Sequence, residues 1–137
     1  MNLEDKLAVS ELLSRSAYGL DMKDLDLLES CFAGDANFLL TIEGVEEVSK
    51  FEGREEVMGL FKGALDTQTD ERKHVISNIW YGEEGTDSAT AVSYLSLFAT
   101  ENGLTTLITT GLYTDKVVKL GGEWKVADRD LKLDRPY

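Results

Sequence analysis

Four long strand-like segments fill the second half of the chain, and this feature limits the possible fold most strongly. The expected strands are His74–Tyr81, Ser88–Thr100, Leu104–Leu120 and Glu123–Leu133. Turn-forming residues separate them, namely Gly82-Glu83-Glu84-Gly85, Glu101-Asn102-Gly103 and Gly121-Gly122. Consecutive strands joined by such short turns pair antiparallel, so the pattern predicts a meander of long antiparallel strands.

The residues before these strands have helical periodicity. Apolar residues recur at three- and four-residue spacing between Leu3 and Tyr18, which predicts a first helix over about this range. Asp24 offers an N-cap for a short second helix over Leu25–Phe32. Gly53 precedes a third helix, which we expect from Arg54 to about Leu65. Helices therefore come first and the long strands follow.

One further strand pair is expected between the second and third helices. Ala36–Ile42 has the composition of a strand, and Val45–Phe51 is its expected hairpin partner across Glu43-Gly44. The order of elements is typical of the α+β class. A long twisted sheet tends to curl. We therefore expect a curved antiparallel sheet wrapped around three helices from the N-terminal half. The sheet and the helices together are expected to form a cone with an internal apolar pocket.

Composition limits the class of protein and of partner. The 137 residues include one Cys and are 42% apolar, which predicts a single domain over residues 1–137 with no disulfide. A net charge of −12 disfavours nucleic acid or an anionic membrane as a partner. No apolar run approaches the ~20 residues of a membrane helix, and the N-terminus is acidic, unlike a signal peptide. We therefore expect a cytoplasmic protein.

The single histidine is the first candidate for chemistry. His74 opens a strand, and Asp21 follows the apolar end of the first helix, where the chain should meet the sheet. Each has a simpler interpretation, since His74 could be an ordinary strand-end residue and Asp21 an ordinary turn residue. If the two side chains face each other in the pocket, the carboxylate would orient the imidazole as a general base.

Other catalytic arrangements find little support in the sequence. One His and one Cys, far apart, argue against a zinc site or a Cys/His nucleophile pair. Neither of the glycine-rich phosphate-binding motifs GxGxxG and GxxxxGK[ST] occurs. The acidic residues are dispersed, as on a solvated surface. We therefore expect no metal and no cofactor.

Five segments, in order, give the chain a family resemblance. They are Tyr18-Gly19-Leu20-Asp21-Met22-Lys23-Asp24, Phe32-Ala33-Gly34-Asp35-Ala36, Phe51-Glu52-Gly53-Arg54-Glu55-Glu56, Arg72-Lys73-His74-Val75-Ile76-Ser77-Asn78 and Gly121-Gly122-Glu123-Trp124-Lys125-Val126-Ala127-Asp128-Arg129. They resemble the segments of SnoaL-like domains in the nuclear transport factor 2-like superfamily. The resemblance covers nearly the whole chain and implies a curved sheet around three helices, a deep apolar pocket and a homo-oligomer, either a dimer or a trimer.

The resemblance also implies roles for two residues. Asp21 and His74 fall where scytalone dehydratase and hexachlorocyclohexane dehydrochlorinase carry a catalytic Asp and His. In those enzymes the His removes a proton from the substrate, and the Asp orients the His. Scytalone dehydratase has a second catalytic His, which this chain lacks, and Leu20 stands where that enzyme has a tyrosine. These departures point to a different substrate within the same class of reaction.

The leading hypothesis is a cofactor-free lyase or isomerase that uses His74 as a general base on a small apolar or aromatic ligand. Dehydration, double-bond isomerisation and cyclisation all fit. Further substrate-binding residues are expected, namely Tyr18, Asn78, Tyr94 and Arg129. The alternatives are a non-catalytic ligand-binding module, a beta-type small subunit of a ring-hydroxylating dioxygenase, and a dimeric structural module whose cone is filled by side chains.

Overall fold

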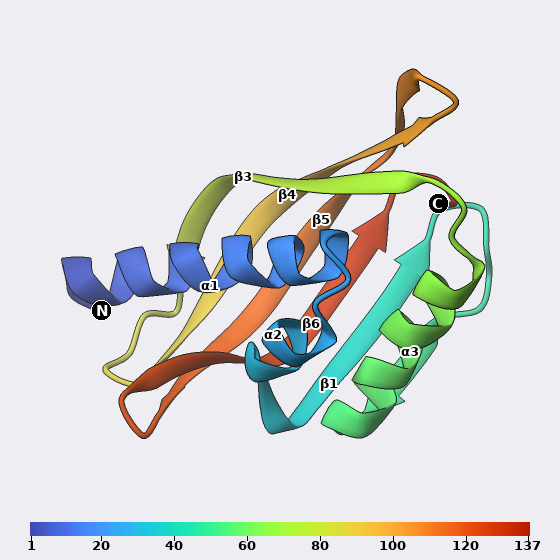
Figure 1. The fold of residues 1–137 in the computed structure, drawn as a ribbon. Helices are drawn as coiled ribbons and strands as arrows, with labels where there is room; N and C mark the ends of the chain where they lie inside the picture. Colours follow the sequence, from blue (N-terminus) through green and yellow to red (C-terminus); the bar gives the residue numbers. More distant parts are fainter.

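Three helices lie against one face of a single six-stranded sheet (Figure 1). The computed structural model describes all residues from 1 to 137. In chain order the elements are α1 (Leu3–Asp21), α2 (Leu25–Ser30), β1 (Phe32–Ile42), β2 (Ser49–Glu52), α3 (Arg54–Thr67), β3 (Glu71–Gly82), β4 (Ser88–Glu101), β5 (Leu104–Leu120) and β6 (Glu123–Leu133). The sheet is strongly curved, and the helices occupy its concave side. The predicted α+β class is confirmed.

The sheet has the order β2-β1-β6-β5-β4-β3. Neighbouring strands are antiparallel, as predicted, except for β1 and β6, which pair in parallel from Phe32↔Val126 to Ile42↔Leu133. This pair arises because the meander from β3 to β6 returns the last strand beside β1. The sheet is therefore mixed, and β2 and β3 form its edges.

Three predicted segments between α1 and α3 differ in length from the structure. The second helix ends at Ser30, and β1 begins at Phe32, because the Phe32 side chain is fully buried and its backbone is already in register with β6. The predicted strand over Val45–Phe51 is reduced to β2. Pairing of β2 with β1 ends at Leu40↔Ser49, which leaves residues 45–48 without a strand partner.

The two tight turns of the meander agree with the sequence prediction. Asn102 and Gly103 join β4 to β5 with φ angles of 52° and 78°, and Gly121 and Gly122 join β5 to β6 with φ angles of 57° and 84°. Two successive residues with positive φ form the turn whose twist matches that of antiparallel strands. These turns fix the register of the three central strands.

Polar contacts hold helix α1 to the sheet at both of its ends. Near the N-terminus, the Trp124 indole N–H donates to Asp5 Oδ1 over 3.0 Å, and Lys119 Nζ lies 3.3 Å from the same oxygen. The hydrogen bond from Trp124 is the main cause that lowers the pKa of Asp5. At the other end, Asp21 contacts β3. Between them, α1 packs its apolar face on a hydrophobic core of 23 buried residues.

Candidate active site

Asp21 is positioned by the close packing of α1 and α2. It is the last residue of α1, and Asp24, the predicted N-cap, accepts a hydrogen bond from the Leu27 N–H over 3.1 Å to start α2. Between the helices, Gly19 lies so close to Leu28 that an added Cβ would be 3.0 Å from the Leu28 backbone nitrogen. The glycine thus lets the end of α1 turn tightly, and the Asp21 side chain faces β3.

The Asp21 carboxylate binds His74 through both of its oxygens. His74 Nδ1 lies 2.5 Å from Asp21 Oδ1, and the backbone N–H of His74 donates to Asp21 Oδ2 over 2.8 Å. His74 lies on β3, an edge strand, whose outward N–H groups have no strand partner. Both side chains are shielded, with 7% of Asp21 and 14% of His74 exposed. The pair is therefore a fixed, partly desolvated unit.

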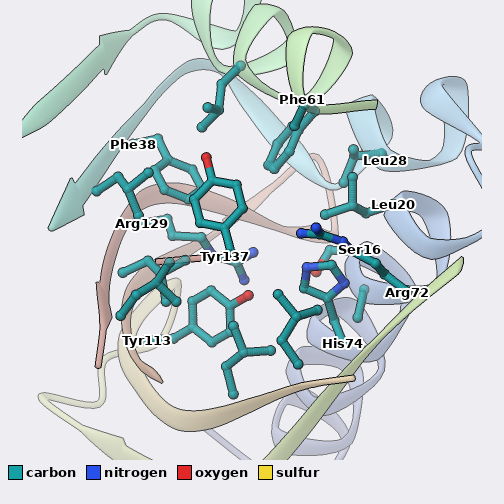
Figure 2. Close-up of a pocket in the computed structure, with 18 of the residues that line it drawn as sticks. Ser16, Leu20, Leu28, Phe38, Phe61, Arg72, His74, Tyr113, Arg129 and Tyr137 are labelled. Carbon is teal, nitrogen blue, oxygen red and sulfur yellow. The ribbon is translucent and has the colours of Figure 1, made fainter. Parts of the chain in front are cut away.

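This geometry determines which nitrogen of the imidazole carries the proton. An ionised carboxylate only accepts hydrogen bonds, so His74 Nδ1 donates to Asp21. In neutral His74 the lone pair then lies on Nε2. The ring is directed into a cavity (Figure 2), so the basic nitrogen is available to a molecule bound there. A carboxylate on one side of an imidazole and a free nitrogen on the other is the arrangement of an oriented general base.

The cavity next to His74 is apolar. It has a volume of about 90 Å³ and is lined by 21 residues, of which 16 are hydrophobic. Side chains of α1, α3 and the concave face of the sheet form its walls (Figure 2). Phe38 and Phe61 meet edge to face on one side, with ring centroids 5.9 Å apart. The cone is therefore open inside, which argues against a core filled by large side chains.

A buried ion pair lies in the wall of the cavity. Arg129 donates to Asp115 from Nε over 2.9 Å and from a terminal nitrogen over 3.0 Å, and the two residues are directly opposite on β6 and β5. Its guanidinium also lies 4.3 Å from the centre of the Tyr113 ring. Burial alone would lower the pKa of Arg129, because it disfavours the charged form. The attraction of the Asp115 carboxylate is stronger than this effect of burial and raises the pKa of Arg129. Arg129 therefore carries a permanent positive charge at the cavity wall.

One side of the cavity combines a second arginine with the last residue of the chain. Arg72 is held by Asp70, with its Nε 2.8 Å from Oδ1, and its guanidinium lies 6.0 Å from the centre of the Tyr137 ring. Arg72, Gln68 and Tyr137 all line the cavity. Tyr137 lies across the cavity in Figure 2. This side of the cavity is thus lined by polar groups.

The structure separates the site residues predicted from the sequence into two groups. Asp21 and His74 are brought into contact, and Arg129 lines the same cavity. The other three residues, Tyr18, Asn78 and Tyr94, do not line it. Tyr18 lies on the exposed side of α1, Tyr94 projects from the convex face of the sheet, and Asn78 is an exposed residue with a φ of 55° at an irregularity of β3. This irregularity interrupts the strict alternation along β3, so Asn78 does not share the face of His74.

Sequence reasoning did not single out Tyr113 and Arg72 as parts of the site. The alternation along its strand places Tyr113 and Asp115 on one face. An acidic residue on that face needs a buried cation, and Arg129 on the next strand supplies it. This signal could have placed Tyr113 beside Arg129. Nothing in the sequence shows that Arg72 reaches the cavity.

No group of three or more His, Cys, Asp or Glu side chains is arranged to hold a metal ion. No helix is long and apolar enough to span a membrane.

Comparisons with known proteins agree with this architecture. A structure from Nostoc punctiforme, a protein of unknown function with a cystatin-like fold, is 27% identical and superposes with a TM-score of 0.82 over 98% of this chain and 94% of its own. A candidate scytalone dehydratase from Novosphingobium aromaticivorans is 24% identical, with a TM-score of 0.78 over 96% and 85% of the two chains. The beta subunit of a candidate aromatic-ring-hydroxylating dioxygenase from the same organism is 17% identical, with a TM-score of 0.81 over 95% and 89%.

The fold is therefore the cystatin-like α+β fold, in which a curved sheet encloses a pocket against its helices. The sequence profile of the SnoaL-like domain matches residues 1–130. The chain belongs to the SnoaL-like domain family. A search of curated protein sequences gave no match.

Proposed function

We propose that the protein is an enzyme in which His74, oriented by Asp21, removes a proton from a small apolar cyclic substrate. Dehydration, double-bond isomerisation and cyclisation all begin with such a step. The observation that carries the proposal is the contact of 2.5 Å between His74 Nδ1 and Asp21 Oδ1, beside an apolar cavity that the same imidazole lines. The structural likeness to a candidate scytalone dehydratase fits this class of reaction.

The chemistry follows from the two ends of the imidazole. Nε2 takes the proton from a carbon of the bound substrate, and the electron pair of that C–H bond forms a new C=C double bond as a hydroxyl group departs from the neighbouring carbon or an adjacent π pair shifts. The imidazolium is stabilised by the Asp21 carboxylate, which receives two hydrogen bonds from His74. One positioned base of this kind contributes about 10²- to 10⁴-fold to a rate. The proton can then return to a different carbon or leave with a hydroxyl group as water.

The proposal is tested by proton exchange from carbon, which needs no knowledge of the natural product. Small cyclic ketones and β-hydroxy ketones are incubated in D₂O, and loss of the C–H signal is followed by proton NMR. We expect the wild-type protein to accelerate exchange of at least one compound above the rate in buffer. If no compound exchanges faster with the protein than without it, the catalytic proposal fails, and a ligand-binding module or a dioxygenase small subunit becomes the better interpretation.

Asp21→Asn is expected to slow this exchange by about 10²-fold. The amide has one acceptor oxygen, which the backbone N–H of His74 requires, so its NH₂ group faces Nδ1. Nδ1 then becomes an acceptor, the proton moves to Nε2, and the base is lost. Asp24→Asn is the matched control, because Asp24 caps α2 and asparagine is an equally good N-cap. Equal rates in both variants would contradict the role given to Asp21.

Homo-oligomerisation stays a prediction. The convex face of the sheet carries two exposed aromatic residues, Trp80 and Tyr94, on neighbouring strands. This face lies on the opposite side of the sheet from the helices and the cavity.

A further inference from the structure

Tyr113 combines a buried ring with a free hydroxyl group. The residue is 5% exposed and lies on the concave face of β5, where it lines the cavity. Its hydroxyl donates to no protein acceptor. Figure 2 shows this hydroxyl directed from the ring toward the part of the cavity where His74 lies. A phenylalanine would form the same apolar wall, so the oxygen is the feature that needs an explanation.

The ring of Tyr113 is held in place by its neighbours. The Arg129 guanidinium lies 4.3 Å from the ring centre and is itself fixed by two hydrogen bonds to Asp115. Ser93 on β4 and Leu131 on β6 are directly opposite Tyr113 in the sheet. Because the ring is packed on a rigid sheet, its hydroxyl has a defined direction before any ligand binds. A preorganised donor of this kind is effective in stabilising developing charge.

The electrostatic surroundings keep this hydroxyl protonated. Burial raises the pKa of Tyr113 to about 12, and the charges of Asp115 and Asp21 act in the same direction, while Arg129 opposes them. The group is therefore a neutral hydrogen-bond donor throughout the pH range in which proteins function. Tyr113 and His74 line the same cavity, so this donor and the proposed base face one bound molecule.

We propose that Tyr113 is a further catalytic residue, which donates a hydrogen bond to the carbonyl oxygen of the substrate while His74 removes a proton from the adjacent carbon. The proposal rests on the proposed function and narrows the substrate class to enolisable carbonyl compounds. His74 Nε2 forms the new N–H bond, the C–H electron pair becomes the C=C bond, and the carbonyl π pair moves to oxygen. Tyr113 stabilises this oxyanion. The enolate then takes the proton back from His74 at a different carbon, or it expels its β-hydroxyl group, which leaves as water with the proton from His74.

A phenol tests this geometry, because a bound phenolate has the planar shape and charged oxygen of an enolate. The probe is 4-nitrophenol, whose ionised form is seen by absorbance and whose affinity is measured by calorimetry. We expect the wild-type protein to bind it as the phenolate, with the released proton on His74. Tyr113→Phe is expected to weaken this binding by about 10- to 100-fold, because a hydrogen bond to a charged oxygen is lost.

Two controls separate the hydroxyl from the wall of the cavity. Nitrobenzene lacks the phenolic oxygen and should bind equally to the wild-type protein and to Tyr113→Phe, which also shows that the variant has kept its cavity. Tyr94→Phe makes the same substitution on the convex face, where Tyr94 is 54% exposed, and should leave the affinity for 4-nitrophenol unchanged.

The outcomes distinguish this proposal from the one on which it rests. If Tyr113→Phe binds 4-nitrophenol as tightly as the wild type while His74→Gln binds it weakly, the role of Tyr113 is overturned and the general base stands. If neither variant weakens binding, or if the wild-type protein does not bind the probe, both proposals fail.

Discussion

Replacing His74 with alanine is expected to lower kcat/KM for proton abstraction by about 10²- to 10⁴-fold, the usual contribution of one general base. His74 is the only histidine in the chain, so no neighbouring imidazole can take over its role. The fold should persist, because the backbone N–H of residue 74 still donates to Asp21 and the strand pairing with Leu97 is unaffected. Exchange of the C–H signal in D₂O, measured on the compound that the wild-type protein turns over, checks the result.

Chemical rescue shows whether the loss concerns the base itself. Free imidazole added to His74→Ala can occupy the space left at the cavity wall and should restore part of the exchange. Lys73→Ala alters the exposed neighbouring residue on the same strand and should keep the wild-type rate. Exchange by His74→Ala at the wild-type rate without imidazole would contradict the mechanism.

The second large effect concerns stability. Arg129→Met is expected to lower the free energy of unfolding by about 3–5 kcal/mol, because Asp115, with none of its surface exposed, would lose the cation that compensates its burial. The ring of Tyr113 would also lose the guanidinium packed against it. Urea denaturation of the wild type and the variant measures the difference. A loss below about 1 kcal/mol, which is typical of exposed ion pairs, would show that the pair is not buried as described.

The double variant Asp115→Leu/Arg129→Met separates two contributions to the free energy of unfolding. One is the destabilisation caused by an unpaired buried charge, and the other is the stabilisation provided by the ion pair. Replacing both partners with apolar residues leaves no uncompensated charge, so most of the lost stability should return. A double variant as unstable as Arg129→Met alone would mean that Asp115 was not the source of the loss. Arg129 thus has a structural role in addition to its place at the cavity.

Much of the fold was predictable because local signals and tertiary packing agree. The two-residue turns at Asn102-Gly103 and Gly121-Gly122 require positive φ, and their residue types predict them directly. The parallel pairing of β1 with β6 was not predictable in the same way, since it depends on which distant strand the last strand of the β3–β6 meander comes to lie beside. The early start of β1 at Phe32 was also missed, because the burial of that ring beside Phe61 overrides a composition that suits a helix end.

The candidate site was also only partly predictable from the sequence, because its residues are distant from one another along the chain. The contact of Asp21 with His74 spans 53 positions and follows from family resemblance, while residue types alone left it open. Tyr18 and Tyr94 were plausible by chemistry, but one faces solvent from α1 and the other projects from the convex face. Asn78 shows how one irregular position in a strand changes the face of the residues beyond it. The alternation along β5 could have indicated Tyr113, but only the three-dimensional structure brings Arg72 to the cavity.

The most direct test of the general base is the tautomer of neutral His74, observed by ¹⁵N NMR of the imidazole nitrogens. One histidine gives one set of signals, so assignment needs no further variants. The contact between Nδ1 and Asp21 predicts a proton on Nδ1 and a free lone pair on Nε2 in the wild-type protein, and a proton on Nε2 in Asp21→Asn. A wild-type His74 with its proton on Nε2, or a tautomer that ignores the loss of Asp21, would contradict the account.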